Sequence, residues 1–271
     1  MSIITISRGT FSGGKSLAES LARRLGFACI DREVIVERAA VNRVSQQELS
    51  DALEKPPSFL ERLQHKKYMY LVLMQAALAE EVQRGRVIYH GNAGHLLLGG
   101  GAPVLRVRII APLDMRIRMA QERLCLTAEE ALHHIEKVDR DRRKWTQYLY
   151  GVDWGDPSLY DLVVNLQYVT IEQACNAVAA LVQTRCLEWD DECRRRLNDI
   201  VVRSRVRAAL ALHAATSHLE VEVESRDGVI DMKGELPSMD ELPEIEKVVR
   251  EVPGVTGLHL NLDALPPAVH W

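Results

Sequence analysis

Eight residues near the start of the chain carry the strongest chemical signal. Residues 9–16 read Gly-Thr-Phe-Ser-Gly-Gly-Lys-Ser and match the pattern G-x-x-x-x-G-K-[ST] in full. Glycines allow backbone angles that turn consecutive N–H groups inward, and a following helix adds the positive end of its dipole. The pattern predicts a polyphosphate site in which Lys15 supplies a charge for the outer phosphates and Ser16 a hydroxyl for Mg²⁺. The residues expected to hold an ATP donor are Gly9, Thr10, Phe11, Ser12, Gly13, Gly14, Lys15 and Ser16.

A flexible Gly/Ser turn would fit the same letters, so the neighbouring segments decide. The apolar run 3–6 precedes the loop, and residues 17–25 follow it with apolar side chains at helical spacing. Strand, glycine-rich loop and helix in this order are what a phosphate-binding loop requires.

A second chemical cluster lies at residues 137–144, which read Lys-Val-Asp-Arg-Asp-Arg-Arg-Lys. On a helix, Arg140 shares a face with Arg143 or Lys144. Phosphoryl transfer spreads negative charge over the transferred group, and cations stabilise that charge. A solvated charged helix explains the same residues, but the aromatic residues that follow at 145, 148 and 150 favour a helix that covers something. We therefore expect Arg140 and Arg143 to act with Lys15 in catalysis.

Strand-like and helical segments alternate through residues 1–185. The strand-like segments are 3–6, 28–30, 86–90, 104–110 and 162–166; the helical ones are 17–25, 57–84, 114–148 and a last helix from 171. This succession predicts an α/β domain with a parallel sheet flanked by helices.

The pattern changes after a charged segment, 186–198, that we interpret as a linker. Residues 199–265 predict a small α+β domain with the order αββαβ: a helix from 200 to about 213, a hairpin formed by 219–224 and 229–234, a helix at 242–252 and a strand at 255–262.

Composition limits the remaining possibilities. The chain has 271 residues, 47% hydrophobic residues and a net charge of −4, so nucleic-acid binding is not expected, although a locally positive cleft is compatible with that charge. The five cysteines form no C-x-x-C pair, and neither a signal segment nor a membrane span is evident. These features predict a cytoplasmic protein with reduced thiols.

Five further segments, together with the loop, resemble the cytidylate kinase-like family: residues 3–8, 30–33, 87–93, 109–116 and 151–165. The similarity covers about residues 1–182 and implies a nucleoside monophosphate kinase fold with a lid that closes on ATP. It places Asp31 near the acceptor or the magnesium shell, although capping of a turn or helix explains that carboxylate too. It also places Arg116 near the adenine or the lid hinge, and matches Arg140 and Arg143 to the lid arginines.

One motif departs from the family. Relatives carry Gly-Arg-Asp or Gly-Arg-Gly after the third strand, where this chain has Gly91-Asn92-Ala93. Asn92 is expected in the acceptor site, but the missing arginine removes a fixed cation from it. The resemblance suggests CMP and dCMP as acceptors. Because the arginine is missing, however, recognition of the cytosine base does not follow.

Residues 199 to about 263 resemble a BON domain, through the hairpin Asp227-Gly228, Gly234 and the Val-Pro-Gly-Val at 252–255. Such domains are associated with phospholipid or protein association. Glu220, Glu222 and Glu224 line one strand face and would be repelled by anionic lipid, so we expect a protein partner and no membrane association.

The sequence therefore predicts an ATP-dependent phosphotransferase of the nucleoside monophosphate kinase type that acts on a small-molecule acceptor. An ATP-binding sensor or regulatory protein with a degenerate acceptor site is the alternative, and a kinase for a non-nucleotide metabolite is a second one.

Overall fold

Five parallel strands form the central sheet of the protein. In a computed structural model, the residues described are 2–40, 44–49, 65–91, 93–99, 101–184 and 190–264. The strands have the order β2-β3-β1-β4-β5, and their bounds are β1 Ile3–Arg8, β2 Ala28–Asp31, β3 Val87–His90, β4 Leu105–Ile110 and β5 Leu162–Asn165. The parallel sheet expected from the alternation of segments is confirmed.

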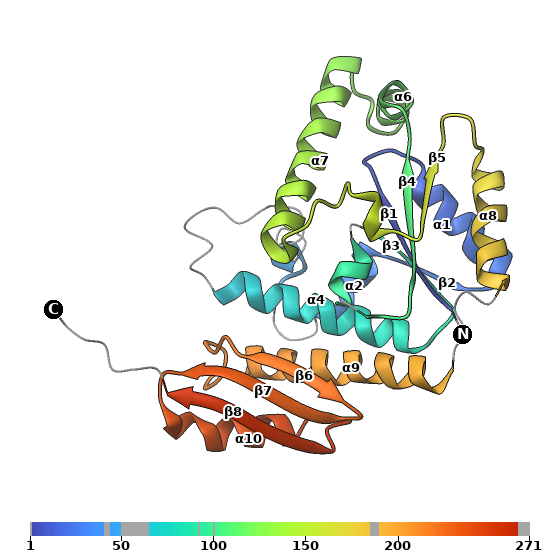
Figure 1. The fold of residues 1–271 in the computed structure, drawn as a ribbon. Helices are drawn as coiled ribbons and strands as arrows, with labels where there is room; N and C mark the ends of the chain where they lie inside the picture. The colour runs from blue at the N-terminus through green and yellow to red at the C-terminus, as the bar shows by residue number, and fades with distance from the viewer. Residues whose placement is uncertain are drawn as a thin grey trace.

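Helices cover both faces of this sheet (Figure 1). The helices α1 (Gly14–Leu25) and α8 (Ile171–Gln183) pack on the face that carries Ile4 and Ile6 of β1. The opposite face, with Ile3, is covered by α2 (Arg32–Ala39), α4 (His65–Gln83) and α5 (Gly94–Leu97). Because both faces of the sheet are covered, five of the six residues of β1 are buried, among them the polar Thr5 and Ser7.

The helical stretch expected at 114–148 is two helices, α6 (Leu113–Leu124) and α7 (Ala128–Tyr150). Cys125 ends α6 in the left-handed region at φ 55°. Thr127 then starts α7 with a reciprocal capping box, since its side chain accepts from the Glu130 N–H and the Glu130 side chain accepts from the Thr127 N–H. The Thr-x-x-Glu spacing is the sequence signal for this second start.

The small domain has the expected αββαβ order. It consists of α9 (Asp191–Leu212), β6 (Glu222–Arg226), β7 (Val229–Leu236), α10 (Leu242–Arg250) and β8 (Gly257–Ala264), with the sheet order β6-β7-β8. Asp227 and Gly228, at φ 51° and 79°, form the hairpin turn. Short 3₁₀ turns lie at Pro157–Leu159 in the first domain and Met239–Glu241 in the second.

The helix expected from residue 200 begins earlier, at Asp191, so the second half of the expected linker is helical. Asp190 caps it by accepting a hydrogen bond from the Cys193 N–H. The helix expected at 57–84 extends beyond the described residues, since 57–64 precede the described start of α4. None of the described helices has both the length and the apolar composition to cross a membrane.

Candidate active site

The loop that follows β1 is fixed by its own backbone and by β4. Gly13 lies in the left-handed region at φ 86° and leads directly into α1. The Ser12 hydroxyl donates within hydrogen-bond distance of two carbonyl oxygens, those of Gly9 at 2.9 Å and Ile109 at 3.1 Å. The first N–H groups of α1, which starts at Gly14, have no intrahelical acceptor and form an anion site. Lys15 stands beside them, half exposed, with its Nζ 3.9 Å from Glu19.

Arg8, the last residue of β1, lies across the start of α1. A Cβ on Gly14 would lie 2.6 Å from Cδ of Arg8, so the close approach needs glycine at that position. Burial lowers the pKa of Arg8, and the charge of Glu33 acts in the opposite direction. A largely buried guanidinium with a single nearby carboxylate is suited to binding a further anion.

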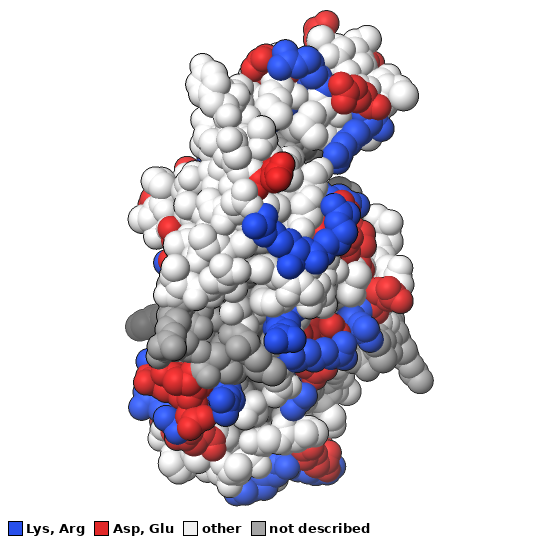
Figure 2. Space-filling model, turned by 90° about the vertical axis from the view of Figure 1, so that its right-hand side faces the viewer, with Lys and Arg blue, Asp and Glu red and all other residues white. Residues whose placement is uncertain are grey.

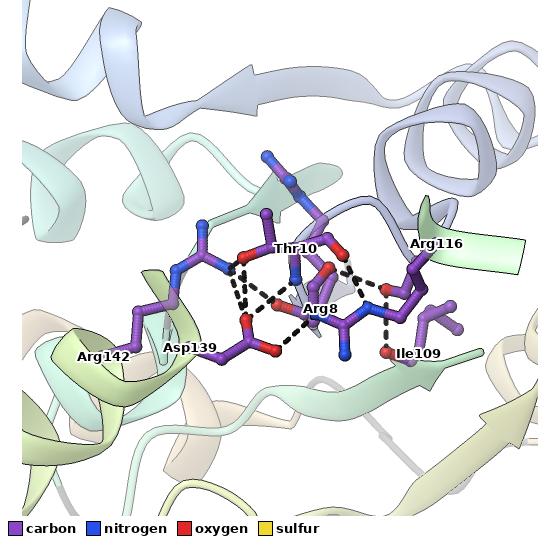
Figure 3. Close-up of polar contacts among 8 residues, drawn as sticks. Arg8, Thr10, Ile109, Arg116, Asp139 and Arg142 are labelled. Carbon is purple, nitrogen blue, oxygen red and sulfur yellow. Dashed lines mark hydrogen bonds and ion pairs between the residues drawn. The ribbon is translucent and has the colours of Figure 1, made fainter. Parts of the chain in front are cut away.

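Asp139 connects the loop to the helices α6 and α7 (Figure 3). Its Oδ1 accepts from the Thr10 backbone N–H at 3.1 Å and from the Thr10 hydroxyl at 2.7 Å. Arg116 donates from Nε to the Thr10 carbonyl at 2.7 Å and pairs with the second oxygen of Asp139. Arg142 donates to the Thr10 hydroxyl at 3.0 Å and to the Arg8 carbonyl at 3.3 Å. One half-buried carboxylate therefore links the loop to both helices.

The loop, the ends of β1 to β3 and α7 enclose a cleft of about 460 Å³, which is in the range of small-molecule sites. Its charged lining is mostly positive: the anions are Glu33 and Asp141, and the cations are Arg8, Lys15, Arg32, Arg123, Lys137 and Arg142. Burial, followed by the charge of Arg8, lowers the pKa of Arg142 to about 10. By contrast, Figure 2 shows basic and acidic side chains in mixed groups on the outer face that it displays.

The floor of the cleft is the ring of Tyr89. Tyr89 is 1% exposed, and a Cβ on Gly91 would lie 2.4 Å from its hydroxyl oxygen, while one on Gly94 would lie 2.3 Å from Cδ1. Both glycines are therefore needed for the ring to occupy this place. Burial raises the pKa of the Tyr89 hydroxyl, which stays a neutral hydrogen-bonding group in the cleft.

A larger groove, of about 760 Å³, is lined by residues of α2, α4, α9 and α10 and of the turn after α10, but most of these residues are apolar. Its arginines, Arg38 and Arg205, are paired with Glu81 and Glu80. It lacks the loop and the excess of cations, so the first cleft is the candidate active site.

The structure gathers most of the predicted donor site in this cleft. The lining includes Thr10, Phe11, Ser12, Gly13, Gly14 and Lys15. Ser16 follows in the first turn of α1. Gly9, the first residue of the loop, is not part of the lining; a Cβ on it would lie 3.4 Å from the Arg116 guanidinium carbon. Arg116 itself supports the loop from α6.

The predicted acceptor and lid residues are arranged differently. Asp31 caps α2 by accepting a hydrogen bond from the Val34 N–H at 3.0 Å, and Asn92 lies outside the described residues. Arg140 and Arg143 are exposed and outside the cleft lining, and Arg143 pairs with Asp153 at 3.3 Å. Arg142, between them, is the arginine that α7 directs to the loop.

The sequence-based interpretation did not single out Arg8, Arg32, Arg123, Arg142 or Tyr89. A usable signal existed for three of them: Arg8, Arg32 and Tyr89 lie at or next to the carboxyl ends of β1, β2 and β3. Ligands of open parallel sheets bind at that edge. Arg123 and Arg142 have no comparable signal, because only the packing of α6 and α7 brings them there.

Two buried histidines, one at the end of β3 and one on α5, lie outside the cleft lining. His90 is 3% exposed and His95 7%; burial lowers the pKa of both, that of His95 to about 4. Among the described residues, no group of three or more His, Cys, Asp or Glu side chains is arranged to hold a metal ion. A hydroxyl such as that of Ser16, together with phosphate oxygens, remains a suitable ligand set for Mg²⁺, which keeps several waters.

Comparisons with known proteins agree with this geometry. The model of the cytidylate kinase-like family matches residues 3–168. The chain belongs to this family. A BON domain model matches residues 198–266, and the chain carries this domain behind its kinase-type domain.

Individual relatives cover the first domain. A cytidylate kinase of Ignicoccus hospitalis is 30% identical over 168 residues, which are 61% of this chain and 90% of that protein. A cytidylate kinase of Staphylothermus marinus is 26% identical over 188 residues, 68% of this chain and 97% of that protein. A crystal structure of an uncharacterized protein from Eubacterium ventriosum matches with a TM-score of 0.55 at 18% identity, over 68% of this chain and all of that chain. These findings support a kinase.

Proposed function

We propose that the protein transfers the terminal phosphoryl group of ATP to the phosphate of a nucleoside monophosphate. The observation that carries the proposal is the composition of one cleft, in which a complete phosphate-binding loop, Lys15 included, faces five further cations and two anions. Lys15 and the loop amides suffice for the donor phosphates. The cations on the opposite wall are then available for a second phosphate, that of the acceptor.

The chemistry follows from this arrangement. An oxygen of the acceptor phosphate attacks the terminal phosphorus of ATP, the bond to the bridging oxygen breaks, and the products are ADP and a nucleoside diphosphate. An ionised phosphate needs no strong general base, so the protein's contribution is to orient the two substrates and to stabilise charge. Arg8 and Arg32 would hold the acceptor phosphate, and Arg142 would neutralise charge as α7 excludes water. The Ser16 hydroxyl would hold Mg²⁺, which would supply positive charge to the donor phosphates when bound.

CMP and dCMP are the first acceptors to test, because the named relatives are cytidylate kinases. Tyr89 and Gly91 line the cleft, and Gly91 directly precedes in sequence the position where the family carries an arginine. The neutral phenol of Tyr89 can donate a hydrogen bond to an acceptor, but it does not replace the charge of that arginine. The cytoplasmic location expected from the sequence stays a prediction.

One specific observation favours the alternative of an ATP-binding sensor: Asn92 and Ala93 replace the family's arginine and its neighbour. In that case the BON domain would transmit nucleotide binding to a protein partner. A kinase for a non-nucleotide metabolite would need a base for a hydroxyl acceptor, and the cleft lining offers Glu33 and Asp141 for that role.

The test is an acceptor panel with the full chain. The protein is incubated with ATP, Mg²⁺ and each nucleoside monophosphate in turn, and ADP and the nucleoside diphosphate are quantified together. We expect equal amounts of both products with CMP or dCMP. ATP binding without acceptor-dependent ADP would instead establish the sensor, and ADP formation with a hydroxylated metabolite alone would establish the second alternative.

A further inference from the structure

The helix α9 belongs to both domains. Its residues Leu197, Ile200 and Val201 are part of the core under the five-stranded sheet, whereas Val202, Val206 and Leu210 are part of the core of the BON domain. Figure 1 shows α9 running along α4, between the two sheets. A helix with two buried faces cannot leave either partner without exposing apolar surface. The first helix of the BON domain is thus also a wall of the kinase-type domain.

Arg207 of α9 holds two side chains of α4 at once. Its guanidinium donates to Oε1 of Gln75 at 3.0 Å and to the hydroxyl of Tyr68 at 3.1 Å. Gln75 is only 8% exposed, so the first of these bonds is largely shielded from water. The planar fork of arginine makes both contacts from one side chain, which the single ammonium of lysine reproduces poorly.

Tyr150, the last residue of α7, packs against the buried cluster to which both α4 and α9 contribute. Burial raises the pKa of its hydroxyl, while the Gln75 amide and the Arg207 charge act in the opposite direction. The hydroxyl has no well-aligned hydrogen bond among the described residues, so packing holds the ring. The ring meets Trp145 edge-on, with 5.7 Å between the ring centres and 65° between the planes.

Trp145 connects Tyr150 to the cleft, because its ring contacts Tyr150 and also lines the cleft. It is 3% exposed and lines the cleft, and it follows Arg142 by three residues, on the same side of α7. Arg142 in turn bonds to the loop at Thr10. A shift of the end of α7 would therefore move both the aromatic wall and the arginine above the loop.

We propose that Arg207 is a positioning residue for the candidate active site. With Gln75 it packs Tyr150 in place, and through Tyr150 and Trp145 it sets the position of α7 over the cleft. The kinetic consequence rests on the proposed function, whereas the effect on Trp145 does not. Acceptor binding should depend on this contact more than donor binding, because β1 and α1 build the donor loop whereas the acceptor must be enclosed between α7 and the sheet edge.

The test compares Arg207→Met with Arg205→Met in the full chain. Arg205 also reaches from α9 to α4, where it pairs with Glu80 at 2.9 Å. The charge that acts on the Tyr150 hydroxyl from α9 is that of Arg207, not that of Arg205. For Arg207→Met we expect the KM for the nucleoside monophosphate to rise about tenfold and the KM for ATP to stay within about twofold. Gln75→Met should reproduce this split, Arg207→Lys should be intermediate, and Arg205→Met should leave both constants within about twofold. Equal effects of Arg207→Met and Arg205→Met, or an equal rise in both constants, would overturn the proposal.

A second readout separates this inference from the proposed function. The emission of Trp145 is obtained as the difference between each protein and the same protein carrying Trp145→Phe. In Arg207→Met it should shift to longer wavelength as α7 loosens, and in Arg205→Met it should not. If wild type phosphorylates no nucleoside monophosphate, the proposed function fails, yet this comparison still decides the role of Arg207. Identical Trp145 emission in wild type and in folded Arg207→Met, verified by thermal melting, would reject it.

Discussion

The loop and the cationic wall opposite it face one cleft, but the chain builds them in different ways. The loop is one continuous segment, residues 9–16, shaped by its own glycines and by the start of α1. The wall collects single side chains from separate elements: Arg8 from β1, Arg32 from α2, Arg123 from α6, and Lys137 and Arg142 from α7. A site of the first kind depends on local backbone geometry, and a site of the second kind depends on tertiary packing.

The two regions also differ in what stabilises them without a ligand. Leaving the loop N–H groups without a protein acceptor costs little free energy, because water can accept their hydrogen bonds. The wall brings like charges together at partial burial, which is unfavourable unless an anion lies among them. Asp139 supplies one such anion, through its contacts with Arg116 and Arg142. Glu33 supplies another through its ion pair with Arg32, and a substrate phosphate would add further negative charge to the wall.

The most severe loss is expected on the loop side. Lys15→Ala should lower kcat on the order of 10³-fold, because it removes a mobile cation beside the donor phosphates. Stability should hardly change, since Lys15 is half exposed and its contact with Glu19 is long. Steady-state kinetics and thermal melting of Lys15→Ala measure both effects. Lys144→Ala, an exposed lysine of α7, is the matched control, and a kcat within about threefold of wild type in Lys15→Ala would contradict the assignment of the loop.

The next effect distinguishes three arginines of α7, of which Arg142 belongs to the wall whereas Arg140 and Arg143 do not. Arg142→Met should lower kcat roughly 10²-fold, because Arg142 bonds to Thr10 and the Arg8 carbonyl above the cleft. Arg140→Met and Arg143→Met should cost less than about threefold, because both side chains are exposed and lie outside the lining. Kinetics of the three variants with one acceptor provide the ranking. If Arg143→Met proved the most damaging, the lid assignment made from the sequence would stand and the one made from the geometry would fall.

The difference between Arg142 and its neighbours Arg140 and Arg143 shows how far the site could be predicted from the sequence. The loop, the parallel sheet and the αββαβ domain follow patterns of adjacent residues, and all three elements are present in the structure. Arg140 and Arg143 were singled out because they lie on one face of an expected helix. The helix is present as α7, but which face turns toward Thr10 depends on how α7 packs.

Packing at long range also explains the other omissions. Spacing within α7 carries no information that Asp139 would bond to Thr10, 129 residues earlier in the chain. The break between α6 and α7 was readable in principle from Thr127 and Glu130, whose capping box restarts the helix. The early start of α9 at Asp191 was equally marked, since Asp190 is a favourable cap that precedes two acidic residues.

The smallest effect concerns pH. Lowering the pH should reduce the stability of α5, which carries Leu97 of the cleft lining, before it affects the loop. His95 lies on α5, beside Leu97 of the cleft lining; burial lowers its pKa from 6.5 to about 4, with a further lowering by Arg106 and an opposing effect of Asp161. Because the unfolded chain binds this proton more readily, the stabilisation is complete above pH 6.5 and declines as the pH falls toward 4. At pH 5.5 the loss should be about 1.4 kcal/mol, or tenfold in the unfolding equilibrium. Denaturant unfolding of wild type and His95→Leu across this pH range measures the difference in the free energy of unfolding. His133→Leu, at an exposed histidine, is the control. Parallel pH profiles for wild type and His95→Leu would mean that the buried imidazole does not govern the stability of α5.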